Sequence, residues 1–203
     1  MANESNSDST EARIGDPCTM VIFGAGGDLT KRLLIPALYN LKASELLPNE
    51  FSLIGFSGNK FSTEEFRETL SKEIREFATV KVDDKTWDWF SERIEYVQGD
   101  FADPAAYKRL ADTIAKADQQ HSAKGNCLFY LAVAPRFFDV VVKQLGDANL
   151  VNEDGGKWRR VIIEKPFGRD LESAHALNND IKKVLEENQI YRIDHYLGKE
   201  TVQ

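Results

Sequence analysis

The sequence is short of three features that would each indicate a particular class of protein. It has only two cysteines, Cys18 and Cys127, too few for a disulfide-rich secreted domain. It has no apolar run near the roughly 18 residues of a membrane span, and no signal-peptide pattern at its start. Its formal net charge of −7 leaves no basic surplus for binding nucleic acid nonspecifically. We therefore expect a cytoplasmic protein with buried, reduced thiols, no metal, and neither a membrane nor a nucleic acid as partner.

The composition that remains is that of an ordinary globular protein. The chain has 203 residues, of which 42% are hydrophobic and 29% are charged. This length suits one large domain that can bury a sizeable core. Residues 1–16 are polar and acidic and are predicted to form a disordered tail. Residues 17–203 are predicted to form the folded domain.

Six apolar runs of strand length alternate with segments of helical periodicity. The predicted strands cover residues 19–23, 51–56, 94–97, 127–133 and 161–163, and a sixth starts near Ile190. Asp170 is expected to cap the last helix. The buried stripe of that helix is predicted to consist of Leu171, Ala174, Leu177, Ile181 and Val184. The alternation, without internal repeats, predicts an α/β fold with a doubly wound, Rossmann-like parallel sheet.

A glycine-rich turn lies between the first predicted strand and a helix. Gly24, Gly26 and Gly27 let the chain turn tightly and approach a ligand, and the helix start directs backbone N–H groups at a phosphate. The general dinucleotide fingerprint has glycine at its sixth position, where this chain has Leu29. Pro36 is expected to remove one hydrogen bond from the helix and to bend it. A dinucleotide-binding turn and a glycine turn without a ligand are both open on this pattern alone.

The end of the second predicted strand bears on the choice of cofactor. NAD-binding sheets usually have a carboxylate there, which accepts hydrogen bonds from the ribose hydroxyls. This chain has Ser57, Gly58, Asn59 and Lys60 instead. Serine, asparagine and lysine can donate to a 2′-phosphate, which a carboxylate would repel. The pattern favours NADP, and a plain polar turn is the alternative.

Two polar clusters follow the fifth and sixth predicted strands. Glu164–Gly168 has the sequence EKPFG and puts Lys165 at the sheet edge where ligands of α/β folds collect. A strand ended by proline, with a solvated lysine, is the alternative there. The second cluster, RIDHYLGKE, contains an acid, an imidazole, a phenol and an ammonium group: Asp194, His195, Tyr196 and Lys199. Such groups can hold a phosphate, and a carboxylate can orient a histidine.

Four strings of the sequence, in this order, resemble the amino-terminal half of glucose-6-phosphate dehydrogenase. They are GAGGDLTKRLLIPALYNL, LFYLAVAP, VIIEKPFGRDLESA and YRIDHYLGKE. The resemblance implies the coenzyme-binding domain of an enzyme that transfers a hydride from C1 of glucose 6-phosphate to NADP or NAD. The product would be the 6-phosphogluconolactone of the pentose phosphate pathway. In the family an antiparallel-sheet catalytic domain follows, and this chain is expected to be truncated at the start of that substrate domain. We therefore expect the fragment to be inactive. The full-length protein would be a homo-oligomer through the missing domain.

The resemblance also implies roles for individual residues. Lys165 resembles the lysine that lies between the nicotinamide and the sugar. Asp194 resembles the carboxylate that holds the catalytic histidine, a base that in the family follows RIDHYLGKE. The substrate phosphate would be held by His195, Tyr196 and Lys199. The pyrophosphate-binding turn would consist of Gly24, Ala25, Gly26, Gly27, Asp28 and Leu29.

Two departures from the family pattern concern the cofactor. The arginine that clamps the 2′-phosphate aligns with Gly58, which leaves Ser57 and Lys60 as donors and keeps NAD as the alternative cofactor. A tyrosine that lies near the cofactor in some relatives aligns with Phe138. The alternative function is a nonenzymatic dinucleotide-binding redox sensor, which would have no need of Lys165 or of the RIDHYLGKE side chains.

Overall fold

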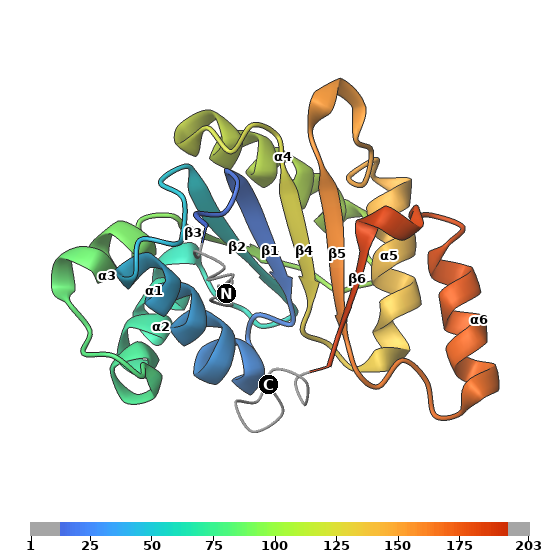
Figure 1. Ribbon diagram of the computed structural model, residues 1–203, viewed down its shortest axis with the longest axis horizontal. Helices are drawn as coiled ribbons and strands as arrows, with labels where there is room; N and C mark the ends of the chain where they lie inside the picture. The colour runs from blue at the N-terminus through green and yellow to red at the C-terminus, as the bar shows by residue number, and fades with distance from the viewer. Residues whose placement is uncertain (1–12, 195–203) are drawn as a thin grey trace, which may run out of the picture.

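A six-stranded sheet forms the centre of the structure, a computed structural model that describes residues 13–194 (Figure 1). Its strands are β1 (Cys18–Phe23), β2 (Phe51–Ser57), β3 (Ile94–Gln98), β4 (Cys127–Leu131), β5 (Arg159–Glu164) and β6 (Ile190–Ile193). All neighbouring strands pair in parallel, in the order β3-β2-β1-β4-β5-β6. The doubly wound, Rossmann-like sheet predicted from the sequence is therefore confirmed.

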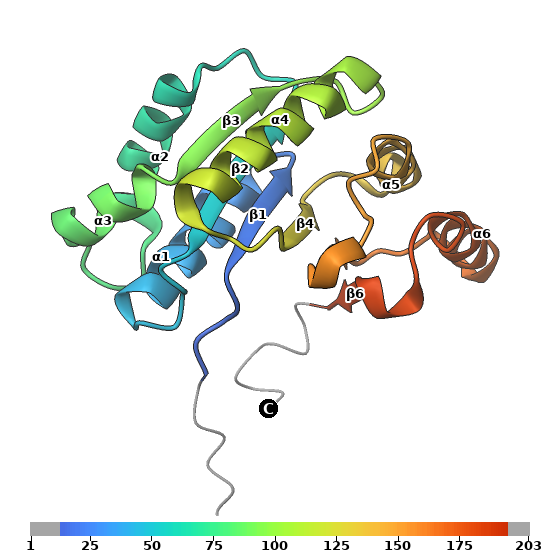
Figure 2. The same cartoon turned by 90° about the horizontal axis from the view of Figure 1, so that it is seen from above.

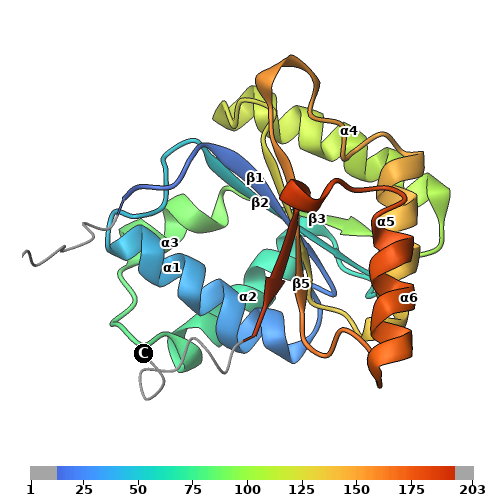
Figure 3. The same ribbon diagram turned by 45° about the vertical axis from the view of Figure 1, so that its right-hand side comes forward.

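Helices cover both faces of the sheet (Figure 3). One face carries α1 (Ile35–Ala43), α2 (Thr63–Phe77) and α3 (Asp84–Ser91), and the other carries α4 (Pro104–His121), α5 (Phe138–Asp147) and α6 (Leu171–Ile181). Figure 2 shows the same division from above. From β1 the chain continues to β2 and β3 on one side, and then crosses back to β4, β5 and β6 on the other side of β1. Because the crossovers are right-handed, the helices of the two halves lie on opposite faces of the sheet. Each face therefore has its own buried apolar cluster.

The helix after the glycine turn begins irregularly. Thr30–Leu34 is π-helical, and α1 starts only at Ile35, with Pro36 in its first turn. Proline has no N–H to donate, and its ring presses on the carbonyl group one turn back. A wider π turn accommodates both effects. The interruption predicted at Pro36 thus takes the form of a π-helical segment immediately before it.

The predicted extent of β4 is wrong at its carboxyl end. The strand ends at Leu131 rather than Val133. Ala132 leaves the ladder, and its N–H donates to the carbonyl oxygen of Tyr130 at 3.2 Å. Apolar character continues into this segment because it packs in a loop, which periodicity alone does not distinguish from a strand.

The start of α6 also differs from the prediction. Asp170 caps the helix as predicted, with its carboxylate accepting from the N–H of Ser173 at 2.8 Å. Leu171, however, is 75% exposed, although the sequence pattern puts it in the buried stripe. The helix joins the core through Leu177 and Ile181, in its second half, so its first residue lies at the surface.

Three observations concern the cysteines, the helix lengths and the metal-binding side chains. Cys18 and Cys127 are buried free thiols, as predicted, and burial raises the pKa of each to about 12. Among residues 13–194, no helix is both long and apolar enough to cross a bilayer. The same residues contain no group of three or more side chains suited to holding a metal ion.

Candidate functional site

The carboxyl ends of β1 and β4 lie side by side where the strand order changes direction. β1 is followed by the glycine turn, residues 24–27, and β4 is followed by the loop of residues 132–134. The helices that follow these two strands lie on opposite faces of the sheet. In open α/β sheets this divergence opens a crevice that ligands commonly occupy. The glycine turn therefore lies at the position where a ligand is most expected.

Gly24 brings the glycine turn directly against the loop after β4. Its φ is +83°, a left-handed conformation that glycine adopts without strain. A Cβ atom at this position would lie 2.2 Å from the carbonyl oxygen of Ala132. The N–H groups of Gly24 and Ala25 both donate to the carbonyl oxygen of Phe56, at 2.8 and 3.3 Å. The turn is thus fixed between β2 and the β4 loop, and no larger residue fits at Gly24 without displacing that loop.

The helix after the turn starts at Asp28, with Leu29 as its second residue. The first N–H groups of a helix have no partner within it and carry a partial positive charge. Gly27 and Asp28 are both exposed, so a ligand can reach this helix start. The arrangement suits a phosphate group, which backbone N–H groups bind without a basic side chain.

Asn59, after β2, lies on the same glycine turn. A Cβ atom on Gly26 would lie 2.3 Å from Asn59 Oδ1, which means that the asparagine side chain occupies this space. The Ser57 hydroxyl donates to Asn59 Oδ1 at 3.0 Å and lies 2.7 Å from Tyr96 OH. Tyr96 OH also donates to the backbone oxygen of Asn59 at 2.8 Å. Burial raises the pKa of Tyr96, so its hydroxyl keeps the proton that it donates.

The side chains predicted to meet the cofactor after β2 thus have different surroundings. Ser57 is buried and engaged with Asn59 and Tyr96, whereas Lys60 is exposed. Sequence reasoning named Asn59 only as one of several donors and missed Tyr96 altogether. The signal that could have found the contact is strand register, because pairing of Phe23 with Phe56 sets the two following turns side by side.

At the other end of this edge, the structure brings Lys165 and Asp194 together. Lys165 Nζ lies 2.7 Å from Asp194 Oδ2, and the side chains are 56% and 19% exposed. The backbone N–H of Lys165 donates to the carbonyl oxygen of Ile193 at 3.2 Å. The Lys165–Pro166 peptide bond is cis. The EKPFG and RIDHYLGKE strings, predicted as separate clusters, therefore meet at one point.

The residue before Lys165 is tied to β4. Glu164 accepts a hydrogen bond on Oε1 from the hydroxyl of Tyr130. Tyr130 is only 6% exposed, and this burial, reinforced by the glutamate, raises the pKa of the phenol. The tyrosine is therefore a neutral donor that holds the Glu164 carboxylate in one position.

Three predicted substrate-binding residues, His195, Tyr196 and Lys199, lie outside the described residues. Phe138, which aligns with a tyrosine near the cofactor in some relatives, is 1% exposed. It begins α5 and packs within the core cluster on that face of the sheet. Its ring therefore has a packing role in this chain.

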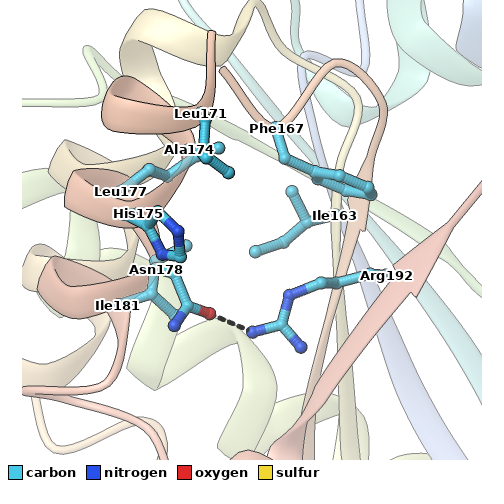
Figure 4. Close-up of a pocket in the computed structure, with 9 residues that line it drawn as sticks. All are labelled: Ile163, Phe167, Leu171, Ala174, His175, Leu177, Asn178, Ile181 and Arg192. Atoms are coloured by element: carbon cyan, nitrogen blue, oxygen red, sulfur yellow. Dashed lines mark hydrogen bonds between the residues drawn. The ribbon is translucent and has the colours of Figure 1, made fainter.

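A small apolar cavity lies between α6 and the β5 and β6 end of the sheet (Figure 4). Its volume is about 190 Å³, and Arg192 and His175 are polar residues in its lining. Arg192 donates to Asn178 Oδ1 and, at 2.7 Å, to Glu187 Oε1. The guanidinium group is thus engaged in holding α6 and the segment before β6. The side chain that pairs with Lys165 is that of Asp194.

Comparison with known proteins points to one family. Residues 21–203 match the family model described as "Glucose-6-phosphate dehydrogenase, NAD binding domain". The chain is 44% identical over 191 residues to glucose-6-phosphate 1-dehydrogenase 2 of Mycobacterium tuberculosis. The matched region covers 94% of this chain and 37% of that protein.

Two solved structures are similar in both fold and sequence. One is a glucose-6-phosphate dehydrogenase in complex with its substrate glucose 6-phosphate, with a TM-score of 0.80 and 33% identity over 93% of this chain and 38% of that chain. The other is glucose-6-phosphate 1-dehydrogenase from Mycobacterium avium, with a TM-score of 0.76 and 34% identity over 90% and 37%. The chain therefore spans little more than a third of the length of the proteins it matches.

Proposed function

The chain belongs to the family of glucose-6-phosphate dehydrogenase NAD-binding domains, and we propose on that basis that it is the coenzyme-binding part of a glucose-6-phosphate dehydrogenase. The whole protein would oxidise glucose 6-phosphate at C1 with NADP, or with NAD as the alternative cofactor. The observation that supports this best is the glycine turn at the change of strand order. Its exposed helix start offers backbone N–H groups to a pyrophosphate.

The glycine turn and the end of β2 would bind the two ends of the adenosine diphosphate moiety. The glycine turn and the helix start, residues 24–29, would hold the pyrophosphate, because the backbone of the turn can approach closely and the first N–H groups of a helix have no partner within it. The adenosine ribose would lie toward the end of β2. Lys60 is exposed there and would supply the positive charge that favours a 2′-phosphate.

Lys165 and Asp194 would contribute to the reacting end of the site. A bound nicotinamide would supply the hydride acceptor for C1, and the proton of the C1 hydroxyl would leave to a general base. Asp194 would hold the histidine base supplied by the catalytic domain, and Lys165 would donate to the sugar. His195, Tyr196 and Lys199 would bind the phosphate group of the substrate. In this proposal the chain alone binds a dinucleotide and does not turn over.

Calorimetric titration of the chain with NADP⁺ and NAD⁺ tests the coenzyme assignment. We expect saturable binding of at least one of them and loss of binding in Gly24→Ala. A parallel assay with glucose 6-phosphate and either cofactor should show no turnover. Failure to bind both dinucleotides would contradict the proposed function, whereas ordinary turnover would contradict only the proposed inactivity of the chain.

Titration with glucose 6-phosphate separates the enzyme from a nonenzymatic redox sensor. In a protein that carries this chain together with a catalytic domain, Lys199→Ala should weaken sugar phosphate binding by about tenfold or more, because a charge-assisted hydrogen bond is lost. Lys108→Ala, on α4, removes the same charge from an exposed helix position and is the matched control. An affinity that is the same in both variants would favour the sensor.

A further inference from the structure

The two faces of the sheet are covered unequally at β5 and β6. On the face that carries α4, α5 and α6, the side chains of Val161, Ile163 and Ile190 are 0, 1 and 7% exposed. On the face that carries α1, Ile162 is only partly buried and Tyr191 is 43% exposed. Figure 1 shows β4 and β5 uncovered by any described helix on this side. These strands therefore present an apolar surface beside α1.

A groove of about 430 Å³ lies between α1 and this surface. A volume of this order with an apolar lining is typical of sites for small ligands. The lining crosses the sheet from Phe51 on β2, past Met20 and Leu128, to Tyr191 on β6. Neighbouring strands are about 4.8 Å apart, so the four steps from β2 to β6 span roughly 19 Å. The groove is therefore elongated and has room for an extended chain.

The end of the groove at β5 and β6 carries a cation without a counter-ion. The Arg160 guanidinium lies over the rings of Trp158 and Tyr191, 5.3 and 5.5 Å from their centroids. Its Nη1 donates to Tyr191 OH at 2.6 Å, while its Nε is buried and has no acceptor in the described part of the chain. No carboxylate of residues 13–194 forms an ion pair with Arg160. Because the tyrosine hydroxyl accepts from the arginine, its own proton is left for another acceptor.

The acidic residue in the lining, Asp16, lies at the amino edge of the sheet. Arg160 is level with Met20, because both pair in register with Leu128. Asp16 precedes Met20 by four residues, which at about 3.3 Å per extended residue is roughly 13 Å. The groove thus has a cation at one end and an apolar lining toward α1 and β1. This distribution of charge is complementary to an anion with an apolar tail.

We propose that the groove binds a straight-chain aliphatic monocarboxylate. The carboxylate accepts from the guanidinium of Arg160 and from the hydroxyl of Tyr191, and the chain lies along Leu128 and Met20 toward α1. The site is separate from the glycine turn, because Arg160 and Met20 lie toward the amino ends of their strands. The inference does not depend on the proposed function, since it requires no dinucleotide.

Calorimetric titration of the chain with decanoate, decanol and decyltrimethylammonium tests the pairing of charge, at concentrations too low for micelles. We expect decanoate to bind about tenfold or more tightly than the other two, because only the carboxylate accepts charge-assisted hydrogen bonds. From hexanoate to decanoate, the affinity should rise about threefold to fourfold for each added methylene group. Decanoate that binds no more tightly than decanol, or with no dependence on chain length, would overturn the proposal.

Arg160→Met removes the cation and keeps an unbranched apolar side chain. The affinity for decanoate should fall by about tenfold or more, and that for decanol should stay within about twofold. Arg32→Met is the matched control, because it removes a guanidinium that lies over another ring, that of Phe77, outside the groove. Tyr191→Phe should weaken decanoate binding by about threefold or more. The midpoint of urea unfolding is measured for each variant, and Tyr191→Phe gives an answer even where Arg160→Met unfolds.

Three further outcomes would contradict the proposal. Displacement of decanoate by NADP⁺ would put the anion in the crevice beside the glycine turn. Loss of decanoate binding in a protein that carries this chain together with a catalytic domain would make that domain the occupant of the groove. A chain that is dimeric in sedimentation equilibrium and binds no decanoate would make a second copy the occupant. Binding of decanoate in both proteins, unchanged by NADP⁺ and weakened in Arg160→Met but not in Arg32→Met, supports the proposal.

Discussion

The two halves of the carboxyl edge of the sheet are built from different chemistry. At β1 and β2, the uncharged residues glycine, serine and asparagine pack so closely that a Cβ atom on Gly24 would lie 2.2 Å from a backbone oxygen, while the charged side chains of Asp28 and Lys60 are exposed beside them. At β5 and β6, charged side chains are held by an ion pair and by a buried phenol. The stability of the first half should therefore be sensitive to added volume, and that of the second half to loss of the hydrogen bond from the buried phenol.

This difference matches the tasks proposed for the two halves. Binding a dinucleotide requires a backbone that approaches closely and does not itself react, which glycine and helix N–H groups provide. In the proposed reaction a histidine base takes the proton of the C1 hydroxyl, Asp194 would hold that base in position, and Lys165 would donate to the sugar. In this proposal, one half of the sheet edge binds the dinucleotide through its shape, and the other half contributes charged side chains to the reaction.

The largest effect is expected from Gly24→Ala in the first half. The new Cβ would meet Ala132 O and the residue would be strained at φ +83°, so we expect the free energy of unfolding to fall by about 3 kcal/mol. Gly155→Ala is the matched control, since Gly155 has φ +76° and a Cβ atom there would have no neighbour within 4 Å. It should cost only the backbone strain, about 1 to 2 kcal/mol. Equal losses in urea unfolding would show that close packing does not set the shape of this half.

A smaller effect is expected from Tyr130→Phe in the charged half. It removes the hydrogen bond to the Glu164 carboxylate and should lower the free energy of unfolding by about 2 kcal/mol, because bonds to charged groups are the stronger ones. Tyr107→Phe, which removes a 3.0 Å bond to the neutral carbonyl oxygen of Phe101, should cost about 1 kcal/mol. A larger loss of unfolding free energy for Tyr107→Phe in the same urea titration would contradict the expectation that the bond to the charged group is the stronger one.

The smallest effect is expected from Lys165→Met. Its ion pair with Asp194 is formed by a side chain that is 56% exposed, so the free energy of unfolding should change by less than about 1 kcal/mol. Arg75→Met removes one partner of another exposed pair, with Asp84 at 2.7 Å, and should behave alike. A clearly larger loss for Lys165→Met, again by urea unfolding, would give the charged half a structural role in addition to the proposed chemical one.

Local patterns in the sequence predicted most of the elements and few of the contacts. Apolar runs and the Asp170 cap located strands and helix starts, because backbone propensity and capping act between neighbours in the chain. The same patterns predicted an end of β4 that is two residues too late, and they predicted that Leu171, which is exposed, would be buried. Burial depends on which face meets another element, and that is decided by packing rather than by periodicity.

The sequence by itself determined the alternation of strands and helices, the glycine turn and the family, because each depends on residue types in a fixed local order. The tertiary structure decided that Asn59 lies on Gly26 and that Lys165 meets Asp194, 29 positions along the chain. Those contacts follow from strand register and from the order of strands in the sheet. Both are set by the packing of the whole domain, which brings together side chains that no local pattern relates.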